Sequence, residues 1–231
     1  MRYMGGKSRI AKPIVDAIRS HGKHVQGRPV LEPFCGGLGV TLALSSLGPV
    51  LCSDTNPSLI ALYQGWQDGW RPPSEVTAED YAAAKHLPDS SPLKAFTRYG
   101  VSFGGCGRSY ARAPGINFAG QTARQLAKQV PAAFSFDCVS FFELEPRPGL
   151  TLYLDPPYQN THRYEGQGTF DSAKFWEHAN AWAAVTDVYV SEFAVPDDWE
   201  IVWSKERVSP IAQSAENYKT RTELLAWKGP K

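Results

Sequence analysis

The sequence has 231 residues, of which 42% are hydrophobic and 20% are charged, and its formal net charge is +1. This length allows one substantial core, or one core with a modest inserted subdomain, and leaves little chain for two independent domains. The cysteines form no Cys-x-x-Cys pair and no histidine stands at metal-ligand spacing, so neither a zinc site nor a disulfide framework is indicated. We therefore expect a protein without a metal, in a reducing cytoplasm. Prolines and glycines interrupt the uncharged segment 33–52, which argues against a membrane span.

Apolar periodicity and turn residues predict helices and strands in two parts of the chain. The elements expected in the first part are a helix over 8–20, a strand at 29–31, a glycine-rich turn at 36–39, a helix over 40–47, a strand at 50–52 and a helix over 57–66. The elements expected in the last part are a strand at 150–154, a helix over 172–184, and strands at 188–191, 201–203 and 223–227. Only a polar loop separates the last two strands, which favours an antiparallel hairpin at the edge of a mostly parallel sheet.

The segment between these parts, residues 67–134, is rich in Gly, Pro, Arg and aromatic residues. We predict that it is an inserted region and that residues 1–66 and 135–231 form the catalytic domain. From Ser90 to Phe136 there is no acidic residue. The basic residues of this stretch are Lys94, Arg98, Arg108, Arg112, Arg124 and Lys128. Such a block of positive charge suits a polyanion, although a merely solvated basic face gives the same pattern.

The segment Leu31–Val40 holds three glycines between an expected strand and an expected helix. Glycines there let the backbone approach a nucleotide-like ligand, but a purely structural turn gives the same signal. The spacing is not Gly-x-Gly-x-x-Gly, which disfavours a dinucleotide and oxidoreductase chemistry. Asp54 ends the next strand, where a carboxylate can accept hydrogen bonds from both hydroxyls of a ribose. The alternative is that Asp54 caps the helix beginning near Pro57, a role for which Asn56 competes.

The most specific element is Asp155-Pro156-Pro157-Tyr158, which follows a buried strand. The exocyclic amine of adenine is a poor nucleophile, because its lone pair is delocalised into the ring. The Asp155 carboxylate and the carbonyl of Pro156 can accept its two N–H groups and draw them out of the ring plane, while the prolines fix the backbone. Tyr158 offers a face on which a flipped base can stack. The alternative is an ordinary proline-rich turn.

Several segments together resemble the Dam-type family of DNA adenine-N6 methyltransferases. They are Arg2-Tyr3-Met4-Gly5-Gly6-Lys7, Glu32-Pro33-Phe34-Cys35-Gly36-Gly37, Asp54-Thr55-Asn56 with Leu59, Ile60 and Tyr63, Asp155-Pro156-Pro157-Tyr158, and Arg221-Thr222-Glu223-Leu224-Leu225. The resemblance implies an α/β, Rossmann-like S-adenosylmethionine methyltransferase fold with an antiparallel edge hairpin and a small inserted target-recognition subdomain. It implies S-adenosylmethionine as methyl donor. The donor-binding residues it implies are Tyr3, Lys7, Phe34, Gly36, Asp54 and Asp137, of which Asp137 would accept the donor's adenine amine.

Within the inserted region, 104–108 and 115–118 resemble the family's recognition hairpin, in which an arginine reads a guanine edge. This chain has Gly104 where the family has asparagine, so the resemblance does not extend to the target sequence. The residues that we assign to DNA contact are Arg108, Arg112, Asn117 and Arg124.

The sequence thus predicts a site-specific adenine-N6 methyltransferase that flips its target base from double-stranded DNA. Carboxamides and other planar amines present the same geometry, so RNA, cytosine N4 and a protein amide stay open as acceptors, as does a DNA-binding module whose catalysis has decayed. We expect no membrane association, a monomer or weak dimer, and the cytoplasm of a bacterium or of a phage-infected host.

Overall fold

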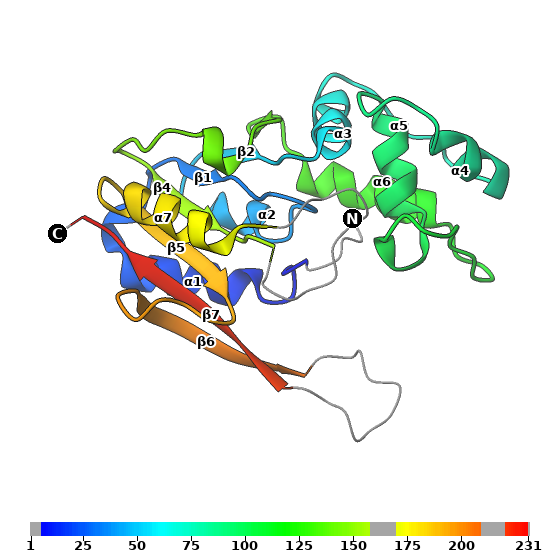
Figure 1. The fold of residues 1–231 in the computed structure, drawn as a ribbon. Helices are drawn as coiled ribbons and strands as arrows, with labels where there is room; N and C mark the ends of the chain where they lie inside the picture. The colour runs from blue at the N-terminus through cyan, green and yellow to red at the C-terminus, as the bar shows by residue number, and fades with distance from the viewer. Residues whose placement is uncertain (1–5, 158–169, 209–219, 231) are drawn as a thin grey trace.

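The computed structural model describes residues 6–157, 170–208 and 220–230. They form one seven-stranded sheet in the order β3-β2-β1-β4-β5-β7-β6 (Figure 1). The strands are β1 (Val30–Glu32), β2 (Val50–Ser53), β3 (Ser135–Asp137), β4 (Thr151–Leu154), β5 (Asp187–Glu192), β6 (Glu200–Val208) and β7 (Thr220–Lys228). Strands β1 to β5 pair in parallel, and β7 is antiparallel to both of its neighbours. The α-helices are α1 (Ala11–His21), α2 (Thr41–Leu44), α3 (Pro57–Gln67), α4 (Ala78–Ala84), α5 (Pro92–Ala95), α6 (Phe118–Gln129) and α7 (Ser172–Ala183).

Each face of the sheet carries its own apolar cluster, because side chains along a strand point alternately to opposite faces. On β4, Tyr153 belongs to one cluster, whereas its neighbours Leu152 and Leu154 belong to the other. The first cluster lies against α1, α2 and α3, and the second lies against α7. The expected doubly covered, mostly parallel sheet with an antiparallel edge is confirmed.

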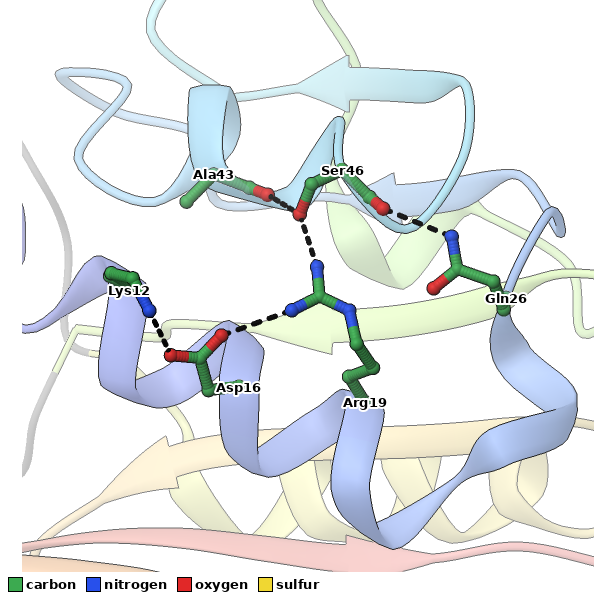
Figure 2. A network of polar contacts seen from close by, with 6 residues as sticks. All are labelled: Lys12, Asp16, Arg19, Gln26, Ala43 and Ser46. Atoms are coloured by element: carbon green, nitrogen blue, oxygen red, sulfur yellow. Dashed lines mark hydrogen bonds and ion pairs between the residues drawn. The ribbon is translucent and has the colours of Figure 1, made fainter.

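A network of polar side chains joins α1 to the turn that follows α2 (Figure 2). Arg19 donates to Asp16 Oδ1 at 3.0 Å and to Ser46 Oγ at 2.7 Å. Gln26 donates to the Ser46 carbonyl at 3.0 Å. Exposed contacts of this kind stabilise little individually. Together they hold α1 beside the turn that follows α2.

Several observed elements differ from the expected ones. The last two strands are longer than predicted, Glu200–Val208 and Thr220–Lys228 in place of 201–203 and 223–227. Strand β3 was not predicted, because its three residues are too few to show a period; parallel pairing with β2, for example Ser53 with Asp137, makes it a strand. The helix predicted over 40–47 is a single turn, Thr41–Leu44, followed by further turn structure. The predicted closing hairpin is present, and its second strand, β7, lies between β5 and β6.

Residues 67–134 carry α4, α5, α6, a π-helical turn η2 (Phe96–Gly100) and a 3₁₀ turn η3 (Phe103–Gly105). Figure 1 shows α4, α5 and α6 gathered beyond α3, away from the β6–β7 hairpin. Phe96, Tyr99 and Leu126 from this region belong to the same apolar cluster as α1 to α3, so the region packs on the rest of the described chain through a shared core. Its separate recognition role stays a prediction. No helix in the described part of the chain combines the length and apolar character needed to cross a membrane.

Candidate active site

The site lies at the edge of the sheet where the parallel strands end. In an open α/β sheet, ligands bind in the crevice beyond the carboxyl ends of the strands, where the strand order reverses, which here is between β1 and β4. An acidic residue ends or directly follows each parallel strand. These residues are Glu32, Asp54, Asp137, Asp155 and Glu192. Parallel topology therefore gathers side chains that are far apart in the sequence.

The glycine turn after β1 is held from two sides. The Gly36 N–H donates to Asp54 Oδ2 at 2.9 Å, and the Tyr63 hydroxyl donates to the Gly36 carbonyl at 2.6 Å. Gly36 has φ +44°, a left-handed conformation in which glycine carries no Cβ penalty. The turn and Asp54 are thus one structural unit, as their sequence order suggested.

Asp54 does not cap α3. The helix begins at Pro57 after Asn56, whose side chain accepts from the Leu59 N–H at 3.3 Å. Asp54 instead accepts from the Asn56 N–H at 2.9 Å, through the oxygen that is not bonded to Gly36. Burial raises the pKa of the Asp54 carboxyl, and these backbone hydrogen bonds oppose the rise. The ribose role of Asp54 stays a prediction.

Lys7 joins the N-terminal segment to the Asp155-Pro156-Pro157 loop. Its ammonium lies 2.5 Å from Asp155 Oδ1 and 3.0 Å from Glu223 Oε1 on β7. The side chains of Lys7 and Glu223 are 1% and 0% exposed, whereas that of Asp155 is 23% exposed. A Cβ at Gly39 would come within 2.8 Å of the Lys7 backbone nitrogen, so the segment packs directly on the glycine turn. Asp155 is therefore the member of this trio that faces the outside.

Two further carboxyls border this trio. Burial raises the pKa of Glu32 well above its usual range, and the charges of Asp155 and Asp54 add to the rise. Burial also raises the pKa of Glu192 to about 7; Asp155 and Glu223 raise it, while the Phe193 N–H and Lys7 lower it. Glu192 Oε1 accepts from that N–H at 2.8 Å. Sequence reasoning gave Glu32 and Glu223 no role of their own, and for Glu192 it left two alternatives open, a place at the border of the cofactor or target pocket and a strand-end cap. Its position directly at the end of β5 was the available signal.

The part of the chain that forms the glycine turn also matches a known family. Residues 3–97 match the D12 class of N6 adenine-specific DNA methyltransferases. With the sheet order described above, this match identifies an S-adenosylmethionine-dependent methyltransferase. No curated protein matches the sequence.

Solved structures that resemble the methyltransferase have low sequence identity to it. The rRNA methyltransferase aviRa from Streptomyces viridochromogenes is 16% identical with a TM-score of 0.48, over 98% of this chain and 86% of that one. PH1948 from Pyrococcus horikoshii, described as a candidate RNA methyltransferase, is 10% identical with a TM-score of 0.48, over 96% of this chain and 83% of that one.

The residues of the methyltransferase fit a donor that carries positive charge. Glu32 Oε2 is buried and has no hydrogen-bond partner in the described part of the chain. The nearby Thr41 hydroxyl opposes the rise in the Glu32 pKa, but it does not complete a hydrogen bond either. An unpaired buried oxygen of a carboxyl group beside a glycine turn is costly unless a ligand group pairs with it. The sulfonium and ammonium groups of S-adenosylmethionine supply such charge. Among the described residues, no three His, Cys, Asp or Glu side chains gather to hold a metal ion.

The other residues predicted to bind the donor lie in different surroundings. Asp137 is exposed at the end of β3, and its carbonyl accepts from the Asp54 N–H at 3.2 Å, so both lie on one rim. Phe34 packs against Phe141 and Phe175, with ring centroids 5.4 and 6.1 Å away. Tyr3 and Tyr158 lie outside the described residues.

The residues assigned to DNA contact lie in the inserted region. Arg108, Arg112 and Arg124 are exposed. Asn117 is exposed too, but its side chain accepts from the Gly120 N–H at 2.7 Å as the N-cap of α6 and donates to the Ser74 carbonyl at 2.8 Å. The structure therefore gives Asn117 a capping function that the sequence analysis did not assign.

The predicted recognition hairpin closes around an isolated antiparallel bridge. Ser102 pairs with Tyr110, and the Phe103 N–H donates to the Ser109 carbonyl at 2.8 Å. The Tyr81 hydroxyl on α4 donates to the Gly107 carbonyl at 2.7 Å and anchors the loop. Phe103 is 71% exposed at the beginning of this loop. The loop is thus short and anchored, and it carries an exposed aromatic ring and the exposed Arg108.

Proposed function

We propose that the chain transfers a methyl group from S-adenosylmethionine to the exocyclic N6 amine of an adenine flipped from double-stranded DNA. The observation that carries this proposal is the contact between Lys7 and Asp155. The family match covers residues 3–97 and includes Lys7 but not Asp155. Asp155 nevertheless lies 2.5 Å from Lys7, as expected if the Asp-Pro-Pro-Tyr loop is the acceptor half of the same enzyme.

The proposed chemistry needs little acid–base catalysis. Asp155 is the exposed end of the buried trio, so a base can reach its carboxylate while Lys7 fixes its orientation. Asp155 and the Pro156 carbonyl hold the amine, and Tyr158 stacks on the ring. The nitrogen attacks the methyl carbon, the carbon–sulfur bond breaks with its electron pair left on sulfur, and the aminium then loses a proton to solvent.

The region that we assign to DNA recognition is 67–134. Its support is the acid-free stretch from Ser90 to Phe136 together with the anchored loop that carries Arg108 and the exposed Phe103. Arginines of such a loop can neutralise phosphates and read base edges. We assign Arg112 and Arg124 to the same surface. We further propose that the protein is a monomer or weak dimer in the reducing cytoplasm of a bacterium or of a phage-infected host.

Nucleoside analysis tests the acceptor. Purified protein is incubated with S-adenosylmethionine and DNA that lacks N6-methyladenine, and digested nucleosides are measured by mass spectrometry. We expect N6-methyladenine as product. Methylation confined to RNA, to cytosine N4 or to protein would overturn the DNA-adenine assignment, and donor binding without any transfer would support a decayed module.

Asp155→Ala tests the catalytic loop. We expect it to retain donor binding by calorimetry and to lose methyl transfer by at least about a hundredfold, the usual range for removing a group that acts in the transition state. The exposed Asp197→Ala is the matched control and should keep wild-type activity. Full activity of Asp155→Ala would rule out the role given to this residue.

A further inference from the structure

The β6–β7 hairpin extends past the carboxyl edge of the parallel strands. Leu224 pairs with Glu192, the last residue of β5, so Arg221, three residues earlier on β7, lies beyond the end of β5. At about 3.4 Å per residue, this places Arg221 roughly 10 Å past that end. Strand β7 is the second neighbour of β4 in the sheet, about 10 Å to its side. Arg221 therefore flanks the Asp155-Pro156-Pro157 loop, which follows β4.

Two exposed cations stand at this end of the hairpin. Arg221 lies on β7, and Lys205 lies on β6 opposite Glu223. In the part of the chain that the structure describes, neither cation makes an ion pair or a side-chain hydrogen bond. The carboxylate of Glu223 is buried and contacts Lys7 instead. Both exposed cations are therefore available to an anionic partner.

The pairing register brings a further basic residue to the same place. Arg207 on β6 stands directly opposite Arg221. Like charges at directly opposite positions of an antiparallel pair are unfavourable, so an anion bound beside them relieves the pair. The exposed Glu206 lies between Lys205 and Arg207 in the sequence, and alternation along the strand assigns it to the other face. The end of the face that holds Arg221 is therefore positively charged.

The contact with Phe193 prepares Arg221 for a phosphate. The guanidinium carbon lies 5.3 Å from the centroid of the Phe193 ring. Stacking against a ring restrains an arginine side chain while its planar N–H donors stay available, and these donors match the oxygens of a phosphate. An arginine restrained in this way loses less conformational entropy on binding than a freely solvated one.

The hairpin and the inserted region lie on opposite sides of the site. One edge strand of the sheet is β3, which directly follows the inserted region, the other edge is formed by the hairpin, and β4 is the middle strand. Figure 1 shows the same arrangement, with α4 to α6 beyond α3 and the β6–β7 hairpin at the other edge. A duplex that reaches from the inserted region across the end of β4 therefore meets the end of the hairpin.

We propose that Arg221 and Lys205 bind the phosphodiester backbone of the target duplex, on the side of the site opposite the inserted region. This inference rests on double-stranded DNA as the partner in the proposed function and not on the atom that is methylated. Phosphate contacts fix the register and orientation of a protein on DNA without reading its sequence. Contacts on both sides of the site hold the duplex across it while one base leaves the stack.

Fluorescence anisotropy with a labelled DNA duplex of mixed sequence, at several salt concentrations, tests the proposal. Arg221→Gln should weaken binding about tenfold at low salt and reduce the steepness of log affinity against log salt by about 1. Arg221→Lys should keep the wild-type steepness, because lysine still binds phosphate as a point charge. Lys205→Gln should reduce the steepness in the same way, with a smaller loss of affinity.

Lys228→Gln is the matched control. Lys228 is the last residue of β7, at the end far from the site, and its ammonium lies 5.8 Å from the centroid of the Trp199 ring. The control therefore also removes a cation from above an aromatic ring. We expect it to keep wild-type DNA affinity and salt dependence.

Wild-type affinity and salt dependence in Arg221→Gln would overturn the proposal and leave this residue as a packing partner of Phe193. If Arg221→Gln does not fold, the exposed Lys205→Gln decides by the same criterion. Tighter binding of RNA than of DNA would overturn duplex DNA as the partner. Salt-dependent DNA binding that Arg221→Gln weakens, without any N6-methyladenine formed by the wild type, would overturn the acceptor assignment and leave this inference standing.

Discussion

The carboxyl edge of the sheet and the inserted loop at 102–110 are built in opposite ways. At the sheet edge, Lys7 and Glu223 are almost fully buried and each charged contact is set by strands from distant parts of the sequence. At the loop, Arg108 and Phe103 are exposed, and the backbone is held by local hydrogen bonds and by α4. Chemistry needs a dry, fixed electrostatic arrangement, whereas recognition needs side chains that can reach a partner. Substitutions should therefore affect stability and methyl transfer at the edge, and DNA affinity at the loop.

The largest effect is expected at Lys7. Lys7→Met removes the cation that Asp155 and Glu223 share, and breaking a buried pair typically costs about 3–5 kcal/mol. We expect a loss of about this size in the free energy of unfolding at pH 8, measured with urea. A variant as stable as the wild type at pH 8 would mean that the trio is not an energetic unit.

Glu192→Gln, unlike Lys7→Met, should raise the free energy of unfolding of the protein without bound donor. The folded pKa of about 7 lies above the usual value of 4.5, so the stabilising contribution of protonated Glu192 is complete below about pH 4.5 and is lost as pH rises through 7. The amide side chain of the variant cannot ionise, so its contribution does not change over this range. At pH 8 we expect the variant to be more stable than the wild type by up to about 3 kcal/mol, with the difference vanishing near pH 4. If the free energies of unfolding of the variant and the wild type changed in parallel from pH 4 to 8, the raised pKa of Glu192 would be contradicted.

Arg108→Ala should affect DNA binding and leave the fold unchanged. We expect an increase in the dissociation constant for DNA that corresponds to about 1–3 kcal/mol if Arg108 reads a base edge. If it contacts phosphate alone, binding should weaken equally on all sequences and the slope of log affinity against log salt should fall by about 1. Fluorescence anisotropy at several salt concentrations separates these cases. Arg19→Ala, on α1 and outside the inserted region, is the control.

The smallest effect is expected at Asn117. Two substitutions there distinguish its role as the cap of α6 from its predicted role in DNA contact. As the cap of α6, Asn117→Ala should lower the free energy of unfolding by about 0.5–2 kcal/mol. Asn117→Asp keeps a capping oxygen but adds a negative charge beside the proposed DNA-binding surface. Wild-type stability with weakened DNA binding in the Asp variant would support both roles. Unchanged DNA affinity would leave Asn117 as a cap alone.

The separate pieces of the catalytic edge could be predicted from local sequence. The glycine turn, Asp54 and the Asp155-Pro156-Pro157 loop each follow a strand, and each can be recognised by residue type and order. Strand β3 could not be predicted, because three residues carry no measurable period and only pairing with β2 orders them. The capping role of Asn117 has a local signal, since asparagine is a favoured N-cap. The sequence interpretation assigned this residue to DNA contact instead.

The sequence by itself determined which chemical groups stand at the strand ends, because those positions are read from short, local patterns. Only the tertiary structure decided that Lys7 meets Asp155 and Glu223, and that Glu32 and Glu192 border them. These contacts join residues from the two ends of the chain, and they depend on parallel strands ending at one edge and on β7 entering beside β5 in the opposite direction. Contacts between charged residues that are far apart in the chain leave no repeating pattern in the sequence. The carboxylate to which we assign the base-holding role was visible in the sequence, but the charged groups that surround it became visible only in the fold.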